Sequence, residues 1–180
     1  LLCLFTDLVR SGLLDVRLFV ASLNHGLRKN AAARDIAFVK AAAAARGIRC
    51  LTRTCQVERY CRTHRLSLEE GARQLRYAFF AQACRHFGVT TVATAHTLND
   101  QAETVLMRLV TGAGITGAGG IHPVMTHPGG IRVIRPLLDV TRTEIESFLG
   151  RSHCTWREDR TNRDTRFLRN GFKGNRHQRT

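Results

Sequence analysis

The sequence predicts an α/β fold in which parallel strands alternate with helices. Short runs of β-branched and apolar residues cover 16–23, 48–54, 90–95 and 131–134, and helical periodicity separates the first three. Strands that alternate with helices become parallel neighbours through right-handed crossovers. At 180 residues the chain has the length of one ordinary domain. We therefore expect a Rossmann-like open parallel sheet flanked by helices.

Capping signals mark the predicted helices. Ser67 and Glu70 have the spacing of a capping box, and Gly88 follows the last apolar position of the strongest helix, over 67–87. Thr141 and Glu144 repeat the box before a shorter helix. The other helices are expected over 1–12, 31–46 and 99–110. Residues 111–130, rich in Gly, His and Pro, predict a mobile loop beside the site.

Arginine dominates the charge of the chain. Lysine and arginine number 28 against 14 acidic residues, which gives a formal net charge of +14, and only three of the cations are lysine. Such a surplus favours a polyanionic partner, because each neutralised phosphate releases counterions. The alternative is an arginine-rich composition with a well-solvated surface.

Cysteine usage and hydropathy exclude several classes of protein. The six cysteines form no CxxC pair, which argues against a zinc site. No secretory signal is visible, so reduced thiols of a cytoplasmic protein are expected. No run approaches the ~18 apolar residues that a membrane span needs. Residues 1–9 have the pattern of a helix interior, and we expect the chain to be a fragment.

Two histidines follow predicted strands. His25 comes after the first strand and His96 after the strand over 90–95. Ligands of open parallel sheets bind beyond the carboxyl ends of the strands, so these side chains are candidates for one site. Alternatively, each histidine caps its strand and bonds to local backbone.

The richest polar stretch covers residues 95–104, where a buried strand meets the start of a helix. Free N–H groups and the positive end of the helix dipole would suit phosphate there. Asp100 could hold Mg²⁺ through one carboxylate while the metal bridges phosphates. The alternative is that Asn99 or Asp100 only caps the helix. On the long helix, Arg73 and Arg76 share a face and could grip phosphates, or form a solvated arginine face.

Five segments of the chain stand out together. They are LNHGLR around His25, GARQLRYAFF at 71–80, TAHTLNDQAETVLMRLVTGAG at 94–114, RPLL at 135–138 and WREDRTNRDTRFLRN at 156–170. One segment would be weak evidence, but five in family order and spacing are specific. Together they resemble a known family, the bacterial tRNA(Ile)-lysidine synthetases of the N-type ATP pyrophosphatase (PP-loop) superfamily. The resemblance implies the fold of the adenine nucleotide alpha hydrolases.

The resemblance implies a two-step reaction on RNA. ATP and Mg²⁺ would adenylate C2 of the wobble cytidine of an isoleucine tRNA with a CAU anticodon, and the amine of free L-lysine would displace AMP. No membrane is involved, and a homodimer is left open. The implied roles are catalysis for Arg76, Asp100 and Arg169, metal binding for Asp100, nucleotide binding for His25, His96 and Gln101, and substrate binding for Arg73, Asp159 and Asn162.

The chain departs from the family pattern in two places. The SGGxDS loop, which binds the ATP phosphates, is expected just before Leu1 and is absent, and Asn99 stands where the family carries Asp. We therefore expect a nucleotide-binding α/β domain over 1–150 that lacks its first strand, and a truncated basic segment over 151–180. A sheet without that strand would have a gap between neighbours. The polypeptide alone is expected to be inactive in adenylation and marginally stable.

Three other functions compete with this interpretation. Sulfur-inserting tRNA enzymes of the same superfamily usually carry CxxC pairs for a cluster, which this chain lacks. A non-catalytic tRNA-binding remnant would keep the basic surface without the ATP loop. A dinucleotide-binding dehydrogenase is disfavoured, because no GxGxxG motif follows a strand.

Overall fold

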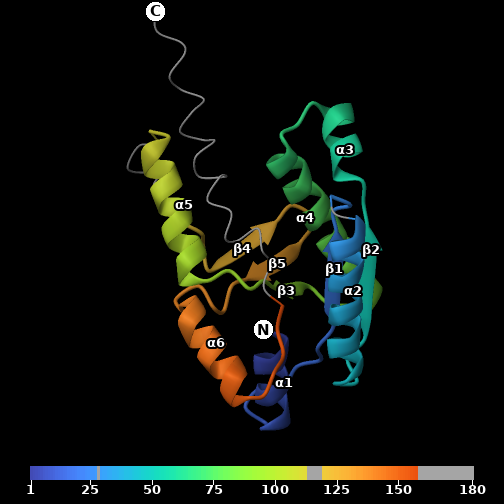
Figure 1. Ribbon diagram of the computed structural model, residues 1–180, viewed down its shortest axis with the longest axis vertical. Coiled ribbons are helices and arrows are strands. Elements are labelled where there is room, and N and C mark those ends of the chain that lie inside the picture. Colours follow the sequence, from blue (N-terminus) through green and yellow to red (C-terminus); the bar gives the residue numbers. More distant parts are fainter. Residues whose placement is uncertain (28, 113–118, 158–180) are drawn as a thin grey trace, which may run out of the picture.

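The computed structural model describes residues 1–27, 29–112 and 119–157 and folds them as helices around two small sheets (Figure 1). The elements in chain order are α1 (Leu2–Arg10), β1 (Val20–Asn24), α2 (Lys29–Ala44), β2 (Cys50–Thr54), α3 (Val57–His64), α4 (Leu68–Phe87), β3 (Thr91–Ala93), α5 (Leu98–Val110), β4 (Val124–His127), β5 (Ile131–Ile134) and α6 (Arg142–Arg151).

The strands pair mainly in parallel, as the alternation of strands and helices predicted. In one sheet β1 pairs with β2, in register from Val20 opposite Cys50 to Asn24 opposite Thr54. In the other sheet the order is β3-β5-β4, with β3 and β5 parallel. Among the described residues no strand pairing joins the two sheets. The α/β class with parallel strands flanked by helices is confirmed, and the described strands form two separate sheets.

The stretch over 111–130 was predicted as a loop, and that prediction was wrong at Val124–His127. These residues form β4, which pairs antiparallel with β5 through a turn in which the N–H of Gly130 donates to the carbonyl of His127. Gly129 and Gly130 take positive φ values of 107° and 79°, which a glycine pair allows at little cost. The strand is four residues long, so its stability comes from pairing with β5 rather than from its own pattern.

The helix ends follow the capping signals. The hydroxyl of Ser67 accepts from the N–H of Glu70 at 3.2 Å, and α4 ends at Gly88 in the left-handed conformation. Both halves of the capping box of Thr141 and Glu144 are formed. The short helix α3 was missed by the sequence pattern; it buries only Val57 and Cys61, too few positions for a clear periodicity.

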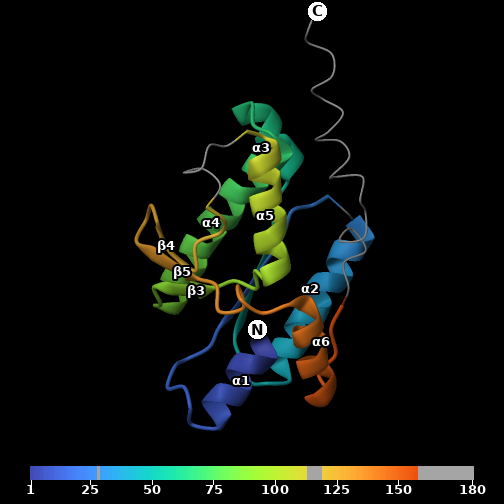
Figure 2. The same cartoon turned by 90° about the vertical axis from the view of Figure 1, so that its left-hand side faces the viewer.

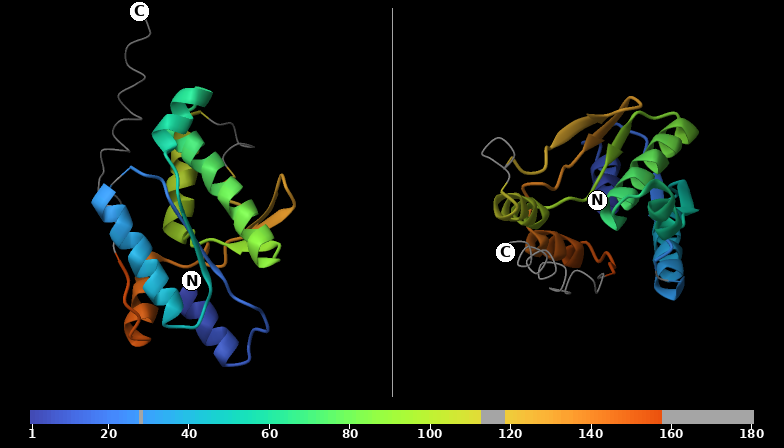
Figure 3. Two further views of the ribbon diagram at one scale, coloured as in Figure 1. Left: turned by 90° about the vertical axis from the view of Figure 1, so that its right-hand side faces the viewer. Right: turned by 90° about the horizontal axis from the view of Figure 1, so that it is seen from above.

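Helix α4 contacts both sheets (Figure 3). On one side Tyr77 and Cys84 pack with Ile131 and Val133 of β5 in the core cluster. At its end Phe87 stacks on Phe19, with ring centroids 4.4 Å apart, just before β1. Because one helix packs on both sheets, their relative position depends on α4 rather than on strand pairing.

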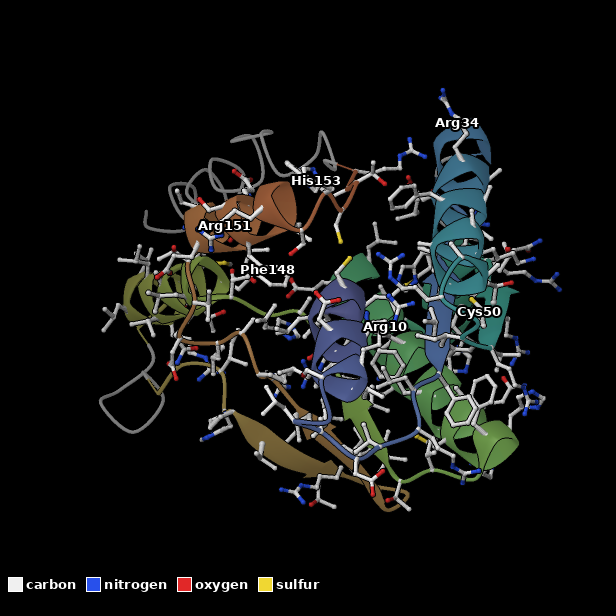
Figure 4. All side chains as sticks on the ribbon, turned by 90° about the horizontal axis from the view of Figure 1, so that it is seen from below. Arg10, Arg34, Cys50, Phe148, Arg151 and His153 are labelled. Carbon is white, nitrogen blue, oxygen red and sulfur yellow. The ribbon has the colours of Figure 1, made fainter. Side chains whose placement is uncertain are left out.

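Polar contacts link α1, α2, α5 and α6 to one another or to neighbouring segments. The first turns of α5 and α6 meet where the N–H of Leu98 donates to the carbonyl of Val140 (Figure 2). Seen from below, α1 lies between α6 and α2 (Figure 4). There the Arg46 guanidinium, just after α2, donates to the thiols of Cys3 at 3.1 Å and Cys154 at 3.5 Å. In the described ranges no helix is both long and apolar enough to span a bilayer.

Candidate functional site at the carboxyl ends of the strands

The carboxyl ends of the parallel strands carry the candidate site. His25 follows β1 directly, and His96 lies three residues after β3. The other two parallel strands are also followed by a residue with a reactive or charged side chain. Cys55 follows β2 and Arg135 follows β5. The rule that ligands bind beyond the carboxyl ends therefore selects four side chains, two on each sheet.

A tight turn fixes His25. The side-chain oxygen of Asn24 accepts from the N–H of Gly26 at 2.8 Å, and Gly26 has a φ of +74°. A β-carbon at residue 26 would lie 2.6 Å from the carbonyl oxygen of Cys55, so the turn accepts only glycine. Nδ1 of His25 lies 3.8 Å from the Cys55 sulfur. Burial lowers the pKa of His25, and the positive charge of Arg76 lowers it further.

His96 has a more highly charged environment than His25. Its Nδ1 shares a hydrogen bond of 2.9 Å with the hydroxyl of Thr94. Burial is the main cause that lowers its pKa, followed by the positive charge of Arg135. Asp100 opposes this shift, whereas Arg76 and Arg73 add to it. Both histidines are thus held in the neutral form at neutral pH, in which one ring nitrogen can accept a hydrogen bond.

Arg76 acts on both sides of the site. Its charge lowers the pKa of His25 on the first sheet and of His96 on the second. This agrees with the position of α4, which carries Arg76 and contacts β1, β3 and β5. Arg73, one turn earlier, stacks over the ring of Tyr77 with its guanidinium carbon 5.1 Å from the centroid. Both arginines are exposed, as the solvated alternative requires, and the charges of both lower the pKa of His96.

Asp100 forms the helix cap that the alternative interpretation described, with Thr97 rather than Asn99 as the N-cap residue. One carboxylate oxygen of Asp100 accepts from the N–H of Thr97 at 2.7 Å and from its hydroxyl at 2.8 Å. The start of α5 was expected to offer free N–H groups to phosphate, and this expectation needs correction. The N–H of Leu98 already donates to Val140, and that of Asp100 to the Thr97 hydroxyl at 3.4 Å.

Two neighbours of Asp100 hold other parts of the chain. The side-chain oxygen of Gln101 accepts from the N–H of Ile121 at 2.5 Å, so the amide predicted to bind nucleotide secures the chain before β4. The side-chain oxygen of Asn99 accepts from the N–H of Arg142 at 3.0 Å, at the start of α6. The amide oxygen of Asn99 therefore joins the starts of two helices, α5 and α6.

Sequence reasoning chose no role for Arg135, which the structure places at the site. It is only 6% exposed and donates to the carbonyl of His122, the hydroxyl of Tyr77 at 3.4 Å and the sulfur of Met125 at 3.2 Å. Its buried Nε lacks a hydrogen-bond partner. The signal was available, because Arg135 follows β5 as directly as His25 follows β1. Three predicted site residues lie outside the described residues: Asp159, Asn162 and Arg169.

The donor set fits an anion better than a metal held by protein alone. The charges of Arg73, Arg76 and the buried Arg135 affect His96, that of Arg76 also affects His25, and Asp100 is the one acidic group among the causes of the His96 shift. Phosphate groups are the natural ligand of such a cluster. In the part of the chain that the structure describes, no three His, Cys, Asp or Glu side chains gather as metal ligands. A single carboxylate is still compatible with magnesium, which usually keeps waters and binds phosphates as well.

An α/β fold with a basic cluster at the ends of its parallel strands defines a nucleotide-binding class of protein. Within that class the chain belongs to the PP-loop domain family, whose model matches residues 1–177. In fold it is similar to the U34-tRNA thiolase NcsA from Methanococcus maripaludis. That likeness has a TM-score of 0.66 at 13% sequence identity and covers 87% of this chain and 55% of the thiolase.

Curated relatives confirm the resemblance seen in the sequence. The chain is 42% identical over 158 residues to a tRNA(Ile)-lysidine synthase of Dehalococcoides mccartyi. The matched region covers 86% of this chain and 34% of that relative. The chain is also 43% identical over 160 residues to the Geobacter sulfurreducens enzyme of the same name, with 89% and 33% covered. The chain thus spans about a third of the length of these relatives.

Proposed function

We propose that this chain carries part of the catalytic domain of a tRNA(Ile)-lysidine synthase, a carbon–nitrogen ligase. The reaction would use ATP to adenylate the wobble cytidine of an isoleucine tRNA with a CAU anticodon, after which free L-lysine displaces AMP. The names of the relatives support this proposal. The structural observation that supports it is the position of Arg76 on α4, the helix that contacts both sheets, from which its charge lowers the pKa of His25 and of His96.

Each group in the site has a role suited to this chemistry. Arg76 and Arg73 would bind phosphates, since exposed guanidinium groups pair with phosphate oxygens in a fixed geometry. The neutral histidines would accept hydrogen bonds from the nucleotide. Asp100 would hold magnesium, which supplies positive charge at the phosphates when bound. Arg169, Asp159 and Asn162 belong to the same proposal as catalytic and substrate-binding residues, as do Gln101 at the nucleotide and a cytoplasmic location.

Asp100 has two roles that substitutions can separate. D100A removes the carboxylate half of the capping box that Asp100 forms with Thr97, and it should lower the free energy of unfolding by about 1 kcal/mol. D100N keeps an oxygen for the N–H of Thr97 but removes the charge, so it should be nearly as stable as the unsubstituted protein. If the charge serves metal or lysine, D100N should still lose activity about a hundredfold. A D100N variant with full activity would show that Asp100 only caps α5.

The decisive experiment is mass spectrometry of isoleucine tRNA after incubation with the full-length gene product, ATP and isotope-labelled lysine. The expected result is label at the wobble cytidine, formed only when ATP is present. A cytidine that gains sulfur instead would identify a tRNA sulfur-transfer enzyme of the same superfamily. Binding of tRNA without any change in mass would indicate a non-catalytic RNA-binding protein.

A further inference from the structure

Helix α3 presents a basic face away from the core. Val57 and Cys61 bury its inner side, whereas Arg59 and Arg62 are exposed on the outer side. Their spacing of three residues places these two arginines on adjacent turns of the same face, and the exposed Arg65 follows at the C-cap in the left-handed conformation. The helix carries one acidic residue, Glu58, so its outer surface remains positive. A polyanion is the ligand that such a row of arginines fits.

A pair of rings lies beside this arginine row. Tyr60 and His64 stack with their centroids 4.1 Å apart and their planes inclined by 28°. His64 is exposed and is among the residues that line a hollow of the surface. This hollow of about 280 Å³ lies against both rings and Arg59. Planar rings next to cations are the combination that binds single-stranded nucleic acid, because bases stack on the rings while phosphates pair with the cations.

The hollow adjoins the candidate site. Cys55 lines it, and the sulfur of the same residue lies 3.8 Å from Nδ1 of His25. On the other side, the hydroxyl of Tyr60 donates to the side chain of Gln74 at 3.1 Å, and Gln74 lies on α4 between Arg73 and Arg76. The rings and Arg59 therefore line a hollow that reaches Cys55, next to His25, and Tyr60 joins this hollow to α4 through Gln74.

We infer that α3 binds the RNA strand next to the reacting nucleotide. Arg59 and Arg62 pair with its phosphates, and one flanking base stacks on His64 above Tyr60. The partner is the tRNA substrate itself, so this inference rests on the proposed function. RNA is favoured over an acidic protein because stacked rings add a recognition element that only a base, with its flat π face, fully uses.

The test compares two double variants of the full-length protein. R59A/R62A removes two charges from α3, and R10A/R151A removes two exposed arginines from α1 and α6 at the opposite end of the molecule (Figures 1 and 4). Binding of isoleucine tRNA is measured by fluorescence anisotropy over a series of salt concentrations. R59A/R62A should weaken binding about tenfold and reduce the slope of log Kd against log salt by about 1.5, whereas the control changes neither.

Stacking is tested separately with H64A and a tRNA that carries 2-aminopurine beside the wobble position. The fluorescence of that base should fall when the unsubstituted protein binds, and the fall should be smaller with H64A. Equal affinity, salt slope and quenching in all variants would overturn the inference, even if lysidine is formed normally. The reverse outcome, loss of RNA binding in R59A/R62A with no lysidine from any protein, would support the α3 surface and refute the proposed function.

Discussion

The two sheets of the molecule differ in how deeply they are buried. In β5, Ile131 and Val133 are 4% and 0% exposed and alternate with more exposed neighbours, the pattern of a strand with one face in the core. No residue of β1 or β2 reaches that degree of burial. The comparison shows that the most deeply buried strand lies in one half of the site, whereas the half that carries His25 is held by strand pairing and by contacts with α2 and α4.

The largest effect is expected where the two halves meet. R76A removes the guanidinium that acts on both histidines, and it should lower kcat/KM for tRNA modification by about a hundredfold or more. The matched control is R85A, an exposed arginine in the last turn of the same helix, which should leave kcat/KM near its normal value. An equal loss of kcat/KM in both variants would mean that the total positive charge of α4, rather than the position of Arg76, determines activity.

Stability should differ between the two sheets. V133A empties a fully buried position of β5 and should lower the free energy of unfolding by about 2 kcal/mol. V20A, the same change in half-buried β1, should cost about 1 kcal/mol or less. Urea denaturation followed by circular dichroism measures both values. A larger loss in V20A would contradict the placement of the core.

The smallest effect concerns the protonation of the two histidines. Both should titrate below the ordinary value near 6.5 in NMR spectra, and R76A should raise both pKa values at once. Since the unfolded chain takes up these protons more readily, stability is unaffected above about pH 6.5 and falls as the pH drops below it. A raised pKa for only one of the two histidines in R76A would show that the charge of Arg76 affects only one of the two sheets.

Much of the fold could be predicted from the sequence because its signals are local. The capping box of Thr141 and the long helix ending at Gly88 depend on residues within one turn of each other. Strand β4 and helix α3 escaped prediction because each is short and offers too few positions for a clear periodicity. Each is stabilised by packing on the next element of the chain, β5 and α4 respectively.

The candidate site was predictable in position but not in its hydrogen bonding. The rule on strand ends located His25 and His96, and it would have located Arg135 if applied to β5 as well. Sequence could not reveal that the oxygen of Gln101 is already occupied by Ile121, or that Leu98 donates to Val140. Those bonds join segments whose approach is set by tertiary packing alone.

Gly71 sets the distance between two rows of arginines. A methyl group on this α4 residue would collide with the Cys61 sulfur of α3, so the two helices can approach closely only because residue 71 lacks a side chain. Any larger residue would push α3 outward and widen the gap between its guanidinium groups and those of Arg73 and Arg76. The phosphates of an RNA backbone have a limited range of spacings. A single added carbon atom at residue 71 would therefore change the distance between the two rows of arginines relative to the phosphates they would bind.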